Sequence, residues 1–501
     1  IIQLSEAEGM PASAGGLGSL REDYLLTVEA IRLALKRLNP NGMLSVTRGL
    51  QAPPRDNIRL FALFAEAIRR SDDDAANRLF QARNYLAATT IATASEPAAA
   101  LIPRFREVCA EFTMDADYFP GIQPGDLTRR NIVSGGVGAG TPGDGGEVGG
   151  LERAARGGSG DGGGGDRARS YYYQAATAIA RGDGGAFLDA WIYDLTPPTD
   201  NQPYFHSFFR PRFLGEYIDA YGDRWFTRLE LGFVVVAMSL AIVLVLGVLM
   251  IVVPVAVARR WFQGVPTDSS LVVRRASGDR GLPSTSGQEQ QAARERRFRP
   301  GVSGIVWSLV HFGLIGIGFM FLEMLFIQRL TRFLGDPLFA TTAVLMAILS
   351  FAGAGSATQA RIAMRPHARV IVGSLSVAVV ALIYGVTIEP LLERLVTSSV
   401  PVRFAVTVIA LLPVSFMLGW QFPAGIAMLR GRGELLPLAW ATNGVASVVA
   451  APLAVLMAMR VGFNAVNLVA ALCYVAVAVL ALLRLKIDTR PAMTTPTGGD
   501  K

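Results

Sequence analysis

Two acidic residues near the start of the chain are the first side chains that could do chemistry. Residues 1–4 form a short apolar run, which predicts the end of a buried strand. Glu6 and Glu8 follow it, beside Ser5 and Gly9, and predict an acidic loop. Because carboxylates can accept and donate protons, this loop is a candidate site.

A second candidate lies in residues 195–209 (LTPPTDNQPYFHSFF), shortly before the first long apolar run. Three prolines predict an extended, turning backbone, and four aromatic residues follow. One interpretation is a structural plug that docks a soluble domain on the bilayer surface. The other makes Asp200 or Tyr204 part of the lining of a substrate pocket.

Polar residues within apolar runs form a third group. Glu323 is an acid well inside a run, where it could snorkel, pair with Arg329, or bind a proton or substrate. Asn443 shares a helix face with Ser447, which favours hydrogen bonds between helices. If the chain is a transporter, Glu323, Gln328 and Asn443 are its candidate polar sites.

The third group lies in the second half of the chain, which must position these side chains. The apolar runs of this half predict an all-α membrane bundle of about seven helices. Each apolar run comes close to or exceeds the ~20 residues that cross a bilayer. The runs are apolar on all sides, which excludes a membrane β-barrel. They cover residues 231–258, 304–327, 338–358, 370–388, 404–429, 435–459 and 461–483.

The first half alternates predicted strands with amphipathic helices, which is the pattern of an α/β sheet. The chain opens on Ile1 rather than Met, and no strand with a Gly-rich turn precedes it. We therefore expect a partial domain that lacks its N-terminal part. The expected strands are 1–4, 42–47, 85–94 and a short one near 118; the expected helices are 24–38, 56–70 and 98–112.

Composition divides the chain further. Sixteen glycines between residues 135 and 165 predict a flexible insert. Arginines are frequent in the loop between the first two apolar runs. The expected parts are an α/β half-domain (1–133), the Gly-rich insert (134–170), a helix with the aromatic junction (171–228), the membrane domain (231–483) with its Arg-rich loop (259–303), and a polar tail (484–501).

Charge and cysteine content exclude several classes. Residues 1–228 carry a net charge of −4 and the rest +11, so the basic residues lie in loops beside the membrane rather than on a nucleic-acid face. We therefore expect the lipid bilayer as a partner and no nucleic acid. Cys109 and Cys473 lie in different halves, which argues against a disulfide and offers no metal site. The distribution of Arg and Lys favours a soluble domain outside the cell.

Several segments together resemble spermidine synthase-like polytopic membrane proteins, in which a major facilitator-like region is fused to a spermidine synthase domain. The resemblance covers nearly the whole chain apart from the Gly-rich insert and the Arg-rich loop. The matching segments are IIQLSEAEG (1–9), LREDYLLTVEAIR (20–32), GMLSVTRGLQAPPRDNIRLFA (42–62), PPTDNQPYFHSFF (197–209), GFMFLEMLFIQRLTRFLGDPLFA (318–340), FAGAGS (351–356), GWQFPAG (419–425) and LAWATNGVASVV (438–449).

The resemblance implies a class I adenosyl-ligand, Rossmann-like fold. Its activity would be aminopropyl transfer from decarboxylated S-adenosylmethionine to an amine such as putrescine, a step of polyamine biosynthesis in the cytoplasmic (inner) membrane. The family places an acidic motif after its fourth strand, so Glu8, and next Glu6, are the catalytic candidates. Tyr24 matches an aromatic residue that follows the active-site loop.

Two other functions stay open. The α/β domain could be a non-catalytic module of a transporter or membrane scaffold. Alternatively, it could be a methyltransferase that uses S-adenosylmethionine on a membrane-bound substrate. The sequence leaves open which amine is the acceptor, whether the chain is catalytically competent, and which oligomer it forms.

Overall fold

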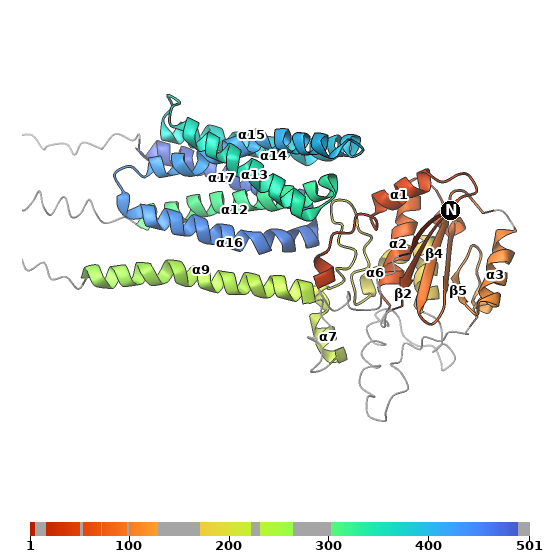
Figure 1. Cartoon of the computed structure of the whole chain (residues 1–501). Helices are drawn as coiled ribbons and strands as arrows, with labels where there is room; N and C mark the ends of the chain where they lie inside the picture. The colour runs from red at the N-terminus through yellow and green to blue at the C-terminus, as the bar shows by residue number, and fades with distance from the viewer. Residues whose placement is uncertain are drawn as a thin grey trace, which may run out of the picture. The chain divides into compact units, whose positions relative to one another are not determined.

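The computed structural model describes eight stretches of the chain, which fold into two compact units, Ile1–Val236 and Ala237–Lys501 (Figure 1). Glu6, Glu8 and the Gly-rich insert lie outside the described residues, as do most of the Arg-rich loop and of the polar tail. The described residues are 1–5, 17–50, 54–71, 73–97, 100–128, 171–221, 231–263 and 302–488.

A small mixed sheet lies at the centre of the first unit. The strand order is β1-β2-β4-β3-β5; β1 and β2 are parallel, and the other neighbouring pairs are antiparallel. Since β2 and β3 are both antiparallel to β4, strands β1, β2 and β3 run in one direction and end at one edge. The five strands described are β1 (Ile2–Ser5), β2 (Met43–Gly49), β3 (Leu79–Arg83), β4 (Ala87–Thr93) and β5 (Asp115–Tyr118).

Helices cross over between the parallel strands, as the sequence pattern predicts for an α/β domain. Helix α1 (Val28–Lys36) connects β1 to β2, and α2 (Asp56–Arg69) connects β2 to β3. Helix α1 begins four residues later than predicted, because Thr27 has an extended backbone and its hydroxyl accepts from the Ala30 N–H at 3.3 Å. Tyr24 consequently lies in the turn before the helix.

The aromatic junction packs into the same core as the sheet. Phe205, Phe208 and Trp191 are buried together with α2. Further along the core, the Phe61 and Tyr118 rings meet edge to face, with centroids 5.2 Å apart. The remaining helices of this unit are α3 (Leu101–Glu111), α5 (Tyr171–Arg181), α6 (Gly184–Ala190) and α7 (Leu214–Tyr221), with 3-10 turns η1 (Leu17–Leu20), η2 (Ala75–Asn77), η3 (Pro124–Asp126) and η4 (Pro211–Phe213).

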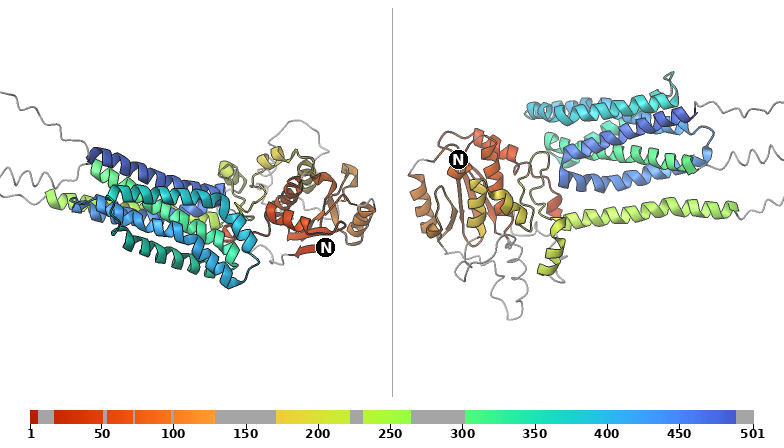
Figure 2. Two further views of the ribbon diagram at one scale, coloured as in Figure 1. Left: turned by 90° about the horizontal axis from the view of Figure 1, so that it is seen from above. Right: turned by 180° about the vertical axis from the view of Figure 1, so that it is seen from behind.

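Seven helices in the described part of the chain are long and apolar enough to cross a bilayer. They agree with the predicted runs, and those of the second unit lie side by side in every view (Figure 2). This supports a multi-pass membrane protein. The helices are α9 (Leu231–Gln263), α12 (Val302–Leu334), α13 (Pro337–Gln359), α14 (Pro366–Leu395), α15 (Val400–Met428), α16 (Leu436–Val461, after the 3-10 turn η6, Gly433–Leu435) and α17 (Phe463–Asp488).

Small residues let α13 and α15 approach closely. A Cβ atom at Gly355 would overlap the carbonyl oxygen of Phe416, and one at Gly419 would overlap that of Ala352. Both obstacles are backbone atoms, which cannot rotate away. These glycines therefore have the packing role that small residues have between membrane helices.

We expect Gly355→Ala to destabilise the membrane unit by about 1–3 kcal/mol, because the added methyl group overpacks the α13–α15 contact. The measurement is the thermal unfolding midpoint of the detergent-solubilised chain. Gly353→Ala is the matched control, since a methyl group there meets no described atom within 4 Å. Equal midpoints for the two variants would contradict the packing role of Gly355.

Candidate functional site

The edge where β1 and β2 end is the natural place for a ligand in a sheet of this kind, because α/β sheets bind ligands beyond the carboxyl ends of their parallel strands. Strand β1 ends at Ser5 and β2 at Gly49. The predicted catalytic residues Glu6 and Glu8 follow β1 directly but lie outside the described residues. Their role stays a prediction.

A carboxylate that the sequence analysis did not single out, Glu22, lies in the segment between this acidic loop and α1. The Tyr24 hydroxyl donates to Glu22 Oε2 at 3.1 Å, and the Tyr204 hydroxyl donates to Oε1 at 3.4 Å. Glu22 and Tyr24 are half-buried, while Tyr204 is buried. The structure thus brings together two predicted substrate-binding residues, one on each oxygen of Glu22.

The surroundings of Glu22 change its acidity. Burial raises its pKa to about 7, although the hydrogen bonds from Tyr24 and Tyr204 work in the opposite direction by stabilising the carboxylate. A group with this pKa is present in both protonation states near neutral pH. It can therefore accept a proton and release it again, as a general base must.

Asp200 has a different place from the two tyrosines. The Thr27 hydroxyl donates to Asp200 Oδ1 at 2.6 Å, and the Asp200 backbone N–H donates to Glu29 Oε2 at 2.9 Å. Both partners lie at the start of α1, and Thr27 is its N-cap. Asp200 therefore ties the Pro-rich segment to this helix end, and its carboxylate points at Thr27 rather than at Glu22.

Two backbone hydrogen bonds reinforce this connection. The Asp23 N–H donates to the Pro203 carbonyl at 2.7 Å, and the Val28 N–H donates to the Pro198 carbonyl at 2.9 Å. Two residues that follow Glu22 are thus fixed to two residues that precede Tyr204. This explains how two segments far apart in sequence place both phenols on one carboxylate.

Beside the end of β2 lies a second polar group, whose members are all buried. Arg48 donates to His206 Nε2 at 3.3 Å, and its Nε atom is 3.9 Å from Asp56 Oδ2. Burial and then the charge of Arg48 lower the pKa of His206 to about 3, so the ring is neutral at pH 7. A neutral imidazole with so low a pKa is a poor general base, which leaves Glu22 as the better candidate.

The membrane candidates fall into two kinds. Asn443 Nδ2 donates to the Phe312 carbonyl at 3.2 Å, and the Ser447 hydroxyl donates to the Gly316 carbonyl at 3.4 Å. Both bonds join α16 to α12 and fit the favoured interpretation of hydrogen bonding between helices. Glu323 is buried in α12, and Gln328, five residues later, is half-buried.

Arg329, the partner considered for Glu323, has contacts with other helices. It donates to Asn464 Oδ1 at 2.6 Å, and its Nε atom lies 3.8 Å from Glu389 Oε1. Among the described residues, no group of three or more His, Cys, Asp or Glu side chains is placed to hold a metal ion.

Comparisons of the chain with protein families, with curated proteins and with solved structures found no match. Glu22 could have been suspected from the sequence only through its place in the acidic, aromatic stretch REDY (21–24). Its contact with Tyr204, 182 residues away, has no local signal.

We expect Asp200→Ala to destabilise the first unit by about 1–3 kcal/mol, because the buried Thr27 hydroxyl loses the closer of its two acceptors and keeps only the Tyr24 carbonyl at 3.3 Å. The thermal unfolding midpoint of the full chain measures the effect. Asp183→Ala is the control, because Asp183 is exposed and its side chain caps no helix. If Asp200→Ala unfolds at the same temperature as Asp183→Ala, the proposed tie is wrong.

Proposed function

We propose that this chain is the membrane-anchored, amine-activating part of an aminopropyltransferase of the spermidine synthase type. The single observation that carries the proposal is Glu22, a half-buried carboxylate held by two tyrosines, with a pKa of about 7. The resemblance supplies the reaction class, and the position of Glu22 after β1 is compatible with it.

The reaction asks for one proton acceptor. An alkylammonium ion cannot attack carbon until it loses a proton, which frees its lone pair. The amine nitrogen then forms a bond to the propyl carbon beside the sulfonium, the C–S bond breaks, and its electron pair stays on sulfur as the thioether leaves. Glu22 takes the proton that the ammonium loses and passes it to solvent.

The two tyrosines have one task in this proposal. Their hydroxyl groups hold the carboxylate in one orientation, which limits the geometries that the amine can adopt. Decarboxylated S-adenosylmethionine would supply the electrophilic carbon when bound, and no described residue is assigned to its adenosyl group.

Glu8 and Glu6 remain the candidates that the resemblance favours, since they follow β1 directly. Glu22 can serve with them as the group that removes the proton from the bound amine. Substitution distinguishes the role of Glu8 from that of Glu22. If the Glu8→Gln variant turns over substrate at the wild-type rate, Glu8 has no part in the mechanism. Methyl transfer from S-adenosylmethionine, without aminopropyl transfer, would favour the methyltransferase alternative.

In a complete, active protein we expect Glu22→Gln to lower kcat by about 10²–10⁴-fold, the usual contribution of a general base. The wild-type rate should rise as pH increases through about 7, because only the deprotonated carboxylate accepts a proton. The measurement is the pH–rate profile of aminopropyl transfer to putrescine. Glu96→Gln, an exposed carboxylate, is the control. A wild-type profile in Glu22→Gln would exclude Glu22 as the base.

We further infer that the first unit faces the cytosol at the inner membrane, because decarboxylated S-adenosylmethionine is a cytosolic metabolite. The distribution of Arg and Lys favours the opposite side, so this point needs a direct test. A reporter fused after Thr128 is expected to be active on the cytosolic side. Reporter activity outside the cell would argue against aminopropyl transfer and for the transporter or scaffold alternative.

A further inference from the structure

Arg59, a buried residue in the first turn of α2, is bound to the segment that carries Tyr204. We propose that Arg59 is a positioning residue that holds Tyr204 against Glu22; its catalytic meaning rests on the function proposed above. The guanidinium donates to four backbone carbonyls of one segment. They belong to Thr196 (2.8 Å), Tyr204 (3.3 Å), Phe205 (2.7 Å) and Ser207 (2.9 Å).

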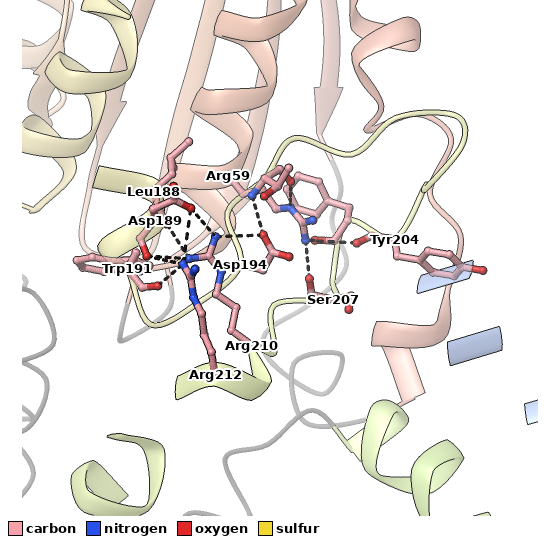
Figure 3. A network of polar contacts seen from close by, with 11 residues as sticks. Arg59, Leu188, Asp189, Trp191, Asp194, Tyr204, Ser207, Arg210 and Arg212 are labelled. Carbon is pink, nitrogen blue, oxygen red and sulfur yellow. Dashed lines mark hydrogen bonds and ion pairs between the residues drawn. The ribbon is translucent and has the colours of Figure 1, made fainter. Parts of the chain in front are cut away.

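Tyr204 is consequently fixed at both ends. Its carbonyl and that of the next residue accept from Arg59, while its hydroxyl lies 3.4 Å from Glu22 Oε1. Figure 3 shows the ring of Tyr204 directed away from the Arg59 guanidinium. A shift of the segment at Arg59 would therefore move the phenol relative to the carboxylate.

Arg59 itself has little freedom to move. Its side chain is buried, and its guanidinium carbon lies 5.1 Å from the ring centroid of Phe208 and 5.8 Å from that of Phe205. Burial raises the pKa of Asp194, which directly precedes the Pro-rich segment. The positive charges of Arg59 and Arg210 and hydrogen bonds from Thr196 outweigh that effect, so the pKa of Asp194 is lowered. The four carbonyls and the two rings thus fix the orientation of the guanidinium.

The number of bonds explains why arginine suits this position. A guanidinium has five N–H donors in a planar fork, whereas a lysine ammonium is a compact point charge at the end of a flexible chain. Lysine would keep the positive charge and the burial of the aliphatic stem. It could not reach carbonyls spread from Thr196 to Ser207 at the same time.

Two other arginines support a different part of the junction and offer a control. Arg210 donates to the carbonyls of Leu188 (2.9 Å) and Trp191 (3.2 Å), and Arg212 donates to that of Asp189 at 2.6 Å (Figure 3). Arg212 is exposed and bonds the chain before the Tyr204 segment begins. Arg212→Lys therefore removes a similar bond without touching the carbonyls that Arg59 binds.

The test is a pH titration of Glu22 in the full chain. Infrared spectroscopy of ¹³C-labelled glutamate carboxyl groups monitors the protonation state. Subtraction of the Glu22→Gln spectrum isolates the signal. The titratable side chains that bond to Glu22 in the described part of the chain include Tyr24 and Tyr204. The Tyr204 bond lowers the pKa of Glu22, so its loss must raise that pKa above about 7.

We expect Arg59→Lys and Tyr204→Phe to shift the Glu22 titration upward by a similar amount, and the double variant to shift it no further. Arg212→Lys should titrate as the wild type does. If Tyr204→Phe shifts the titration and Arg59→Lys does not, Arg59 does not position Tyr204. Loss of the unit's circular dichroism in Arg59→Lys would also overturn the proposal, because it would assign Arg59 to core stability.

Failure of this inference is distinguishable from failure of the proposed function, because the titration requires no turnover. A shifted Glu22 signal in a chain without aminopropyl transfer would support the positioning role and reject the reaction. Conversely, transfer that depends on Glu22 but not on Arg59 would support the reaction and reject the positioning role.

Discussion

The first unit depends on one connection. It joins the turn before α1 to the Pro-rich segment, which lies near the C-terminal end of this unit. Two backbone hydrogen bonds, from Asp23 to Pro203 and from Val28 to Pro198, fix the two segments. The Thr27–Asp200 bond, between buried groups, adds to them. The two backbone N–H donors belong to buried residues and would lose their acceptors if the segments separated, which makes the connection costly to break. The site at Glu22 exists only because this connection holds.

The chemistry of Glu22 follows from partial burial. A fully exposed carboxylate would be too weak a base near neutral pH, and a fully buried one would be out of reach of an amine. Glu22 lies between these limits, and hydrogen bonds from two phenols stabilise its deprotonated form. The neighbouring Arg48–His206–Asp56 group shows the other extreme, where burial leaves the imidazole neutral and of little use for proton transfer.

The sequence predicted most of the elements and little of the site. Apolar runs of ~20 residues are a local signal, so the seven long helices were predictable. Strand β3 was not, because Gln81 and Arg83 interrupt its hydrophobic pattern although every residue in it is buried. The start of α1 was misplaced because Thr27 acts as a cap only in the folded backbone. Tyr24 and Tyr204 were predicted separately, but their common partner Glu22 depends on contacts across 182 residues.

The distance along the chain between Thr27 and Asp200 also bears on how the protein is made. At about 5–20 residues per second, the 173 residues between them take roughly 10–35 s to synthesise. Until then the start of α1 lacks its partner, and the buried aromatic residues of the junction have not emerged from the ribosome. The Pro-rich segment appears shortly before α9, the first long apolar helix. Closure of the first unit and delivery of the chain to the membrane therefore fall in the same short interval of translation.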